Sequence, residues 1–187
     1  MRKEAEILHQ NVEYSFKIKI QELPEYKAKI VYTDGLSSND QRKTQFDAEL
    51  AFIELYILMP DYWDEEKEIW PIDWLNSIAA IPTKNNTWLS VGDTIPAGNP
   101  PKAIYTNLKA TYFILSKPLL LERLFNQNSD NAPNTSPLAI IPIFENEWLY
   151  KQSKGTVPLL RKLTKKGNTE LVDSYREPVT RKRFLRL

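Results

Sequence analysis

The chain of 187 residues has no cysteine and a single histidine, His9. Without cysteine there is no disulfide, no thiolate nucleophile and no cysteine-ligated zinc or iron–sulfur site. A triad or metal site needs several converging partners, so we expect His9 to be an ordinary surface residue. We therefore expect no metal and no cofactor, and the composition is consistent with a reducing cytoplasm.

Long apolar runs and phosphate-binding loops are missing as well. No apolar stretch approaches the ~18–20 residues of a membrane helix, and the polar N-terminus shows no signal-peptide core. The five glycines form neither Gly-x-Gly-x-x-Gly nor a Walker loop, and His-x-x-Glu-His and Gly-x-Ser-x-Gly are absent. Carboxylates are plentiful, but no catalytic pair is singled out. We predict a soluble protein that is not an enzyme and has no membrane partner.

Charge is unevenly distributed along the chain. Residues 1–150 hold 14 basic and 21 acidic residues, a net charge of −7, whereas residues 151–187 hold 11 basic and 3 acidic residues, a net charge of +8. This asymmetry indicates a charged partner, or a basic segment that packs on its own acidic body. Residues 178–187 are expected to form a basic C-terminal tail.

Apolar periodicity predicts an α+β (or mixed-sheet α/β) fold: a single domain with a mixed β-sheet flanked by helices. Residues 48–59 are apolar on both parities, which is typical of a central strand buried on both faces. No linker separates two cores. Further strands are expected at 14–20, 27–33, 109–116 and 138–144, helices at 70–81, 119–125, 145–154 and 156–166, a long loop at 83–101 and an exposed polar loop at 126–137.

Four residues within these elements carry expectations of their own. Pro71 suits the first position of a helix, and Pro82 is expected to end that helix. Pro142 favours an edge strand or a bulge. Glu54, inside the central strand, is expected to be hydrogen-bonded near a strand end, because buried polar groups are usually satisfied.

Five blocks of sequence follow one another between residues 27 and 177. They resemble, in order, motifs of the suppressor-of-fused family: a Thr-x-Gly-Met-Ser turn, a central strand, a Trp-Pro helix start with an Asn-Asn-Thr-Trp-Leu block and a Gly-x-Thr-Ile loop, a Leu-Ile-Pro-Ile-Tyr block, and a Val-Asp-x-x-Arg ending. The blocks are Thr33-Asp34-Gly35-Leu36-Ser37, Glu54-Leu55-Tyr56-Ile57, Trp70-Pro71-Ile72-Asp73-Trp74-Leu75-Asn76 with residues 85–96, residues 138–147, and Val172-Asp173-Ser174-Tyr175-Arg176.

The resemblance implies one suppressor-of-fused-like domain over residues 1–187, of the compact bacterial type, that binds proteins. Some bacterial members look like immunity proteins or antitoxins against polymorphic toxins, often nucleases. Fold membership alone does not identify the partner. The resemblance thus leads us to expect an immunity protein that neutralises a toxin by direct binding. A general interaction adaptor remains the alternative.

The first candidate contact surface is the acidic, aromatic stretch of residues 61–74. Aromatic side chains anchor interfaces, and carboxylates steer a basic partner such as a nuclease toxin domain. The alternative is that the tryptophans are core and the acids a solvated connection; for Trp70 and Trp74 the helical spacing with Ile78 favours the core. The candidate contacts in this stretch are Asp61, Trp63, Asp64, Glu65, Glu66 and Glu68.

The second candidate surface is the long loop at 85–99, because long loops in compact domains tend to be functional. Its candidate contacts are Asn86, Asp93 and Thr94. A self-packed loop is the alternative, favoured for Asn86 and for Trp88 as a core plug. Nucleic-acid binding through the basic tail, with Arg181, Lys182, Arg183 and Arg186, is a minor third hypothesis.

Overall fold

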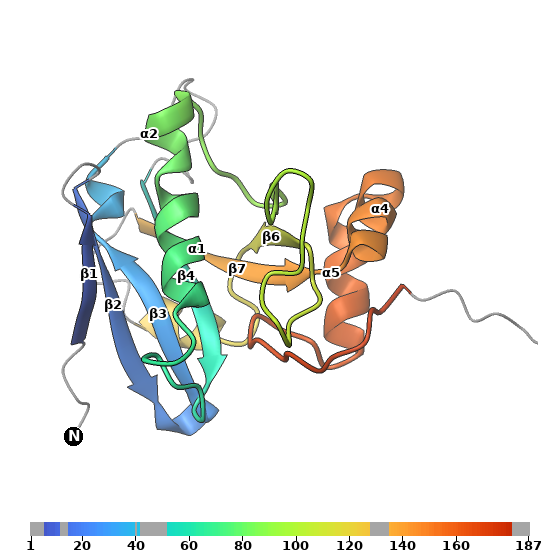
Figure 1. Ribbon diagram of the computed structural model, residues 1–187, viewed down its shortest axis with the longest axis horizontal. Coiled ribbons are helices and arrows are strands. Elements are labelled where there is room, and N and C mark those ends of the chain that lie inside the picture. The colour runs from blue at the N-terminus through green and yellow to red at the C-terminus, as the bar shows by residue number, and fades with distance from the viewer. Residues whose placement is uncertain (1–5, 12–14, 40, 42–51, 128–134, 181–187) are drawn as a thin grey trace, which may run out of the picture.

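All the strands that the structure describes join one mixed sheet, ordered β1-β2-β3-β4-β7-β6-β5 (Figure 1). This computed structural model describes residues 6–11, 15–39, 41, 52–127 and 135–180. Only the β4–β7 pair is parallel; all the other pairs are antiparallel. The strands are β1 Glu6–Asn11, β2 Phe16–Leu23, β3 Ala28–Asp34, β4 Phe52–Pro60, β5 Thr94–Pro96, β6 Tyr112–Ser116 and β7 Thr135–Ile143.

Helices cover both faces of this sheet, which confirms the predicted α+β fold. The helices are α1 Trp70–Ala79, α2 Ile81–Asn85, α3 Glu122–Gln127, α4 Glu145–Lys154 and α5 Thr156–Lys165, with short 3-10 turns η1 Pro24–Tyr26 and η2 Leu36–Ser38. One apolar cluster joins α1 to the sheet. A second cluster joins α3, α4 and α5 to the other face. None of the helices in the described residues is long and apolar enough to cross a membrane.

The position of strand β4 explains why both its odd- and its even-numbered residues are apolar. Its odd-numbered side chains, Ile53, Leu55, Ile57 and Met59, enter the cluster beneath α1. The even-numbered Tyr56 and Leu58 enter the cluster beneath α5. Because alternate side chains of a strand point to opposite faces, a strand between two helical layers must be apolar throughout. The predicted central strand is confirmed for the residues described.

Helix α1 begins at Trp70 with Pro71 in its first turn, as predicted. It ends at Ala79, three residues before Pro82, which was expected to end it. A second helix, α2, starts at Ile81 and carries Pro82 in its own first turn, where a missing N–H costs no hydrogen bond. The expected loop at 83–101 therefore contains the end of α2 and the short edge strand β5.

Pro142 lies in an interior strand whose register with β6 has no shift, so the expectation of an edge strand or a bulge is wrong. β7 lies between β4 and β6, but its pairing with β4 covers only residues 135–139. Pro142 is opposite Phe113 of β6, beyond the end of the β4 ladder. The Pro142 carbonyl instead accepts a hydrogen bond from Arg176 Nη2, at 2.8 Å. Beyond the β7 ladder, the Leu58 carbonyl of β4 instead accepts the Val172 N–H at 2.8 Å, so proline at 142 removes no hydrogen bond of the β4–β7 ladder.

The remaining boundaries differ at the two polar segments. The predicted loop at 126–137 overlaps the end of α3 and the first three residues of β7; residues 128–134 lie outside the described residues, as do 181–187 of the predicted basic tail. His9 is exposed on β1, opposite Ile18, as expected for a surface residue. The expected helices at 145–154 and 156–166 are confirmed as α4 and α5.

Candidate functional site

Residues 61–69, the connection from β4 to α1, form an ordered loop that we call the acidic segment. Its first residues are fixed by backbone hydrogen bonds from Asp61 N–H to the Lys27 carbonyl and from Trp63 N–H to the Pro60 carbonyl, each 3.0 Å. The Trp63 ring is only 3% exposed and enters the core. Its Nε1–H donates to the Glu68 carbonyl at 3.0 Å, so the indole ties both halves of the segment together.

Lys29 of β3 fastens the acidic segment to the sheet. Its ammonium donates to the Trp63 carbonyl and to Glu65 Oε2, both at 2.8 Å. The same ammonium lies 5.9 Å from the centre of the Trp63 ring. The hydrogen bond from Lys29 holds the pKa of the Glu65 carboxyl below its usual value. Glu65 is therefore a carboxylate whose charge is used within the chain.

Asp64 closes a tight turn inside the segment. Its Oδ1 accepts the N–H groups of Glu66 and Lys67, at 3.1 and 3.3 Å. Its other oxygen forms an ion pair with the Lys67 ammonium, and that contact lowers the pKa of Asp64. A side chain that accepts from backbone groups two and three residues later is a typical turn former. Asp64, like Glu65, stabilises the conformation of the segment.

The remaining side chains of the acidic segment form a surface that is partly apolar and partly acidic. Tyr62 is 76% exposed and Ile69 is 55% exposed, one near each end of the segment. Asp61 and Glu66 are exposed and Glu68 is half-buried. No ion pair joins these three carboxylates to another residue in the part of the chain that the structure describes. Exposed apolar groups beside carboxylates without counter-ions suit a partner that is both apolar and basic.

The predicted contacts of this stretch thus divide into two groups. Asp61 and Glu66 are exposed and Glu68 is half-buried without an ion pair, whereas Trp63 is core and Asp64 and Glu65 are engaged locally. Trp70 is buried as expected, 6.5 Å from the Tyr105 ring. Trp74 is half-buried against Phe113, with ring centres 5.1 Å apart. Tyr62 and Ile69 lie in the predicted stretch but are not among its named contacts, because sequence position does not show which apolar side chain of an irregular loop faces solvent.

The 85–99 loop is mostly self-packed. Asp93 Oδ2 accepts the Ser90 N–H at 2.7 Å, and Thr94 lies in β5 opposite Ile114. Asn86 is exposed and caps α2 in a left-handed conformation, φ 48°. Trp88 remains 47% exposed, so the expectation that it plugs the core is wrong.

The structure does not bring Asn86 of the second predicted surface next to the acidic segment. The acidic segment precedes α1, whereas Asn86 follows α2 at the far end of that helix (Figure 1). A ten-residue helix alone separates its ends by about 15 Å. A partner bound to one surface need not touch the other.

Three carboxylates elsewhere, on buried Glu147 and Glu170 and on half-buried Glu54, each bind backbone or side-chain donors. Glu54 accepts from the Thr33 hydroxyl and from the N–H groups of Gly35 and Ser37, at 3.1 and 2.9 Å, and burial raises its pKa. Glu170 accepts from the Leu119, Leu120 and Leu121 N–H groups and from the Tyr56 hydroxyl. Glu147 pairs with Arg176. These contacts confirm the expectation for Glu54 and indicate structural roles.

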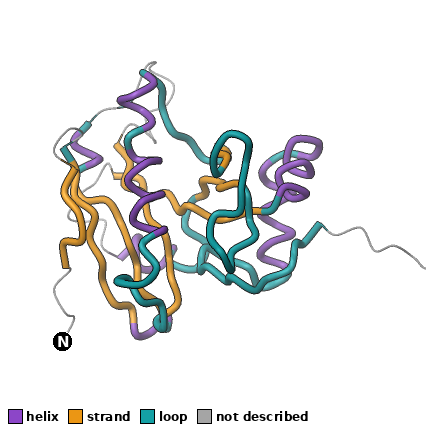
Figure 2. The backbone as a smooth tube through the Cα atoms, in the orientation of Figure 1, coloured by secondary structure: helices purple, strands orange, loops and turns teal. Residues whose placement is uncertain are grey.

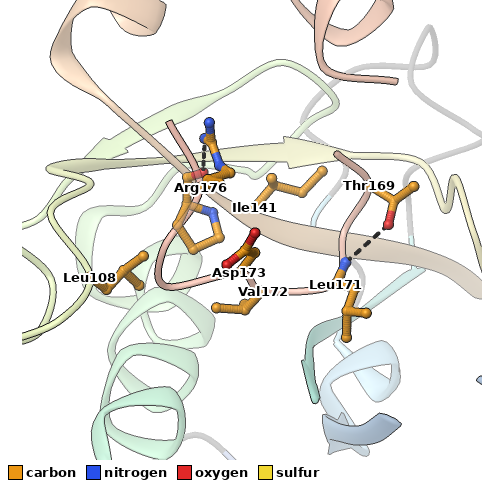
Figure 3. A pocket seen from close by; sticks show the side chains of 8 residues that line it. Leu108, Ile141, Thr169, Leu171, Val172, Asp173 and Arg176 are labelled. Carbon is orange, nitrogen blue, oxygen red and sulfur yellow. Dashed lines mark hydrogen bonds between the residues drawn. The ribbon is translucent and has the colours of Figure 1, made fainter. Parts of the chain in front are cut away.

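Two hollows lie around the segment that follows α5. The first has a volume of about 10 Å³ and is lined by residues such as Leu108, Ile141 and Val172 (Figure 3). It has room for one water molecule at most. In Figure 3 the Arg176 guanidinium points away from it to the Pro142 carbonyl. The second is an open groove of about 440 Å³ with lining charges of both signs, and its Arg176 is already bound to Glu147.

Neither hollow gathers groups that resemble a catalytic constellation. Within the described residues, no group of three or more His, Asp or Glu side chains could hold a metal ion. Among the tyrosines of the described residues, Tyr56 has the hydroxyl whose pKa departs most from its ordinary value. Burial raises its pKa, and its hydrogen bond goes to the Glu170 carboxylate inside the core. The surface features of the acidic segment are therefore the strongest candidate for function.

These features define a mixed α+β domain with an acidic, partly apolar candidate contact surface. The family model described as suppressor of fused protein (SUFU) matches residues 14–177. The chain belongs to the suppressor of fused family. No curated protein matches it.

Two solved structures share its fold. A crystal structure from Neisseria gonorrhoeae, described as a SUFU homologue, superimposes with a TM-score of 0.67 at 17% identity, covering 97% of this chain and 90% of that one. The Sufu–Fu complex superimposes with a TM-score of 0.58 at 16% identity, covering 87% of this chain and 77% of that one. At such identities the likeness establishes the fold alone.

Proposed function

We propose that this chain is a non-catalytic protein-binding domain that uses the acidic segment to bind a basic partner. The proposal rests on one observation: Tyr62 is 76% exposed and Ile69 is 55% exposed, and both lie in the same segment as the carboxylates of Asp61, Glu66 and Glu68. Protein-binding by a related fold supports this proposal, because one similar solved structure is the Sufu–Fu complex.

Rigidity of the segment also supports binding. Trp63, Lys29 and Asp64 fix the loop before any partner arrives. A surface that is already ordered pays little conformational entropy on association. Exposed aromatic and aliphatic anchors then supply affinity, while the carboxylates accelerate encounter with a positively charged surface.

The finer proposal is that the partner is a toxin domain and that the chain acts as an immunity protein, or antitoxin, in the cytoplasm. A nuclease toxin exposes a basic surface that binds phosphates. An acidic protein that covers this surface would block substrate access. The alternative is an adaptor that binds a basic protein without neutralising a toxin, and the two differ only in the consequence of binding.

A co-expression experiment separates these two functions. The full chain is co-expressed with the product of a toxin gene adjacent to its own gene. We expect co-purification and survival of the host. Binding without survival would leave the adaptor, and the absence of both would contradict the immunity proposal.

Variants of the acidic segment test the surface itself. Tyr62→Ala should weaken partner binding by about tenfold or more, as expected for a central aromatic anchor. Tyr175→Ala is the matched control, because Tyr175 is 79% exposed and lies far along the chain, after α5. Glu66→Gln with Glu68→Gln should slow association at low salt, while Glu122→Gln with Glu145→Gln should not. Equal effects of the test and control variants would remove the acidic segment from the proposal.

A further inference from the structure

Helix α5 exposes a row of cations. Leu159 and Leu163 are buried in the sheet-facing cluster, while the opposite side of the helix is exposed. The helix contains no acidic residue. Residues four apart on a helix are neighbours, and like charges at that spacing repel one another. The exposed cations are Arg161, Lys162 and Lys165 of the helix and Lys166 directly after it, and they form two pairs at this spacing, 161 with 165 and 162 with 166.

No carboxylate of the described residues relieves this repulsion. None of the four cations forms an ion pair within the described residues, where such pairs join, for example, Lys19 to Asp34 and Arg176 to Glu147. Lys162 lies over the Tyr150 ring, 5.2 Å from its centre, which leaves its charge unpaired. A helix C-terminus favours cations in its last turn, but Arg161 lies before that turn. The exposed face of α5 therefore fits an anionic partner.

The acidic segment has the complementary character. It carries the exposed carboxylates of Asp61 and Glu66 and the half-buried Glu68 beside the exposed apolar groups Tyr62 and Ile69. On α5, Val157 is 64% exposed and lies one turn before Arg161. Each surface thus combines charge of one sign with exposed apolar area, and the signs are opposite.

The two surfaces cannot meet within one chain. Trp63 anchors the acidic segment in the cluster on the α1 face of the sheet. Leu159 and Leu163 anchor α5 in the cluster on the other face. Figures 1 and 2 show the same separation, with α5 on the right of the view and the loop from β4 to α1 at the lower left. Between two copies, however, the surfaces are free to pair.

We propose that the acidic segment of one copy docks on the exposed face of α5 of a second copy. The contact is head-to-tail, so each docked pair still has one acidic and one basic surface free, and further copies add in the same way. The inference rests on the acidic segment of the proposed function. A basic partner would compete for that segment, so binding of the partner would dissociate the self-associated copies.

Light scattering and sedimentation of the full chain test this contact. At low salt the mass of the wild type should rise with protein concentration. At about 1 M salt, where the screening length is ~3 Å, it should return to that of the monomer. A wild type that stays monomeric at low salt up to its solubility limit overturns the proposal.

Two half-neutralised variants give a sharper test. Glu66→Gln with Glu68→Gln removes acidic groups, and Arg161→Gln with Lys165→Gln removes basic ones. Each variant alone should be monomeric. A mixture of the two should form one-to-one dimers and no larger species, because only one intact acidic segment and one intact α5 face are available per pair. A mixture that stays monomeric would contradict the pairing.

Matched controls and a competing ligand complete the experiment. Lys102→Gln with Lys109→Gln, and Glu122→Gln with Glu145→Gln, remove equal charge from exposed positions outside the two surfaces and should leave self-association unchanged. If the wild type is monomeric and instead binds an RNA or DNA oligonucleotide through Arg161 and Lys165, the cations of α5 form a nucleic-acid-binding surface and the proposal is wrong.

The failure of this inference is distinguishable from failure of the proposed function. Arg161→Gln with Lys165→Gln leaves the acidic segment intact. This variant should therefore bind the basic partner as well as the wild type does, although it no longer self-associates.

Discussion

The Glu147 carboxylate and the Arg176 guanidinium form a two-pronged ion pair, with both hydrogen bonds 2.7 Å long. Glu147 is fully buried and the Arg176 side chain is 8% exposed. The same carboxylate accepts the Phe144 N–H at the start of α4 and the Val179 N–H of the C-terminal segment, each at 2.9 Å. One carboxylate thus ties the last described residues to the helix and, through Arg176, to the Pro142 carbonyl.

Glu147→Gln should destabilise the fold by about 3–5 kcal/mol, because it leaves a buried guanidinium without its counter-charge. Urea unfolding followed by tryptophan fluorescence measures the change. The control is Lys67→Gln, which breaks the exposed ion pair to Asp64 and should change stability little. A Glu147→Gln variant as stable as Lys67→Gln would show that the buried pair does not hold the C-terminal segment.

Half of this arrangement was readable from the sequence. Glu147 stands three residues after the residue preceding α4, the spacing of a capping carboxylate, and the helix was predicted with the correct bounds. Arg176 stands 29 residues later, and no local pattern predicts which of many basic residues returns to a given carboxylate. Pairings of this kind are decided by tertiary packing.

In the sheet and the candidate site, too, local patterns predicted some features, while others depend on tertiary packing. The apolar run of β4 predicted a central strand because both its faces are buried. The edge strands β1 and β5 were missed, because short strands that pair through backbone groups leave little side-chain periodicity. In the acidic segment the sequence shows the charges but not the direction of the aromatic side chains: Trp63 is buried and Tyr62 is exposed, and an irregular loop has no periodicity that predicts this.

Lys29→Met should loosen the acidic segment without unfolding the domain. The substitution removes the hydrogen bonds to the Trp63 carbonyl and to Glu65 but keeps an unbranched apolar side chain of similar length. Amide hydrogen exchange in residues 61–69 should become faster, and exchange in β4 should not change. Partner binding should weaken through faster dissociation, since a loose segment must be ordered in the complex.

A matched variant identifies the cause of that loosening. Lys19→Met also breaks a lysine–carboxylate pair on the sheet, to Asp34, but makes no contact with the acidic segment. It should leave exchange in residues 61–69 unchanged. Equal exchange in both variants would mean that Lys29 does not position the segment.

Glu54 should make stability depend on pH in an unusual direction. Burial raises its pKa above the ordinary value of 4.5, although Thr33 and the Ser37 and Gly35 N–H groups act the other way. The folded state then binds more protons than the unfolded state between the two pKa values, so unfolding free energy falls as pH rises through that window. Above the raised pKa the loss is complete, and below 4.5 it is absent.

Comparison with Glu54→Gln isolates this contribution, because the other titrating groups are common to both proteins. The stability of the wild type relative to Glu54→Gln should decrease as pH increases from about 4.5. Denaturant unfolding over a series of buffers measures it. A relative stability that increases with pH would mean that the hydrogen bonds to the carboxylate outweigh its burial.

Gly92 should be the glycine least tolerant of a side chain. Its φ is 92°, and a Cβ would lie 2.6 Å from the Thr156 hydroxyl oxygen at the start of α5. Gly92→Ala should cost about 1–3 kcal/mol, from left-handed strain and from the overlap with Thr156. Gly167→Ala is the control for strain alone, since its φ is 77° and nothing lies within 4 Å of the added Cβ. We expect the smaller loss there in urea unfolding.

A double-mutant cycle then separates overlap from strain at residue 92. Thr156→Ala removes the hydroxyl and methyl groups that crowd the site and leaves a Cβ contact at 3.3 Å. Gly92→Ala should therefore cost less in the Thr156→Ala background than in the wild type, and the remaining cost should approach that of Gly167→Ala. An unchanged cost would show that backbone strain alone, and not the contact with α5, excludes a side chain at Gly92.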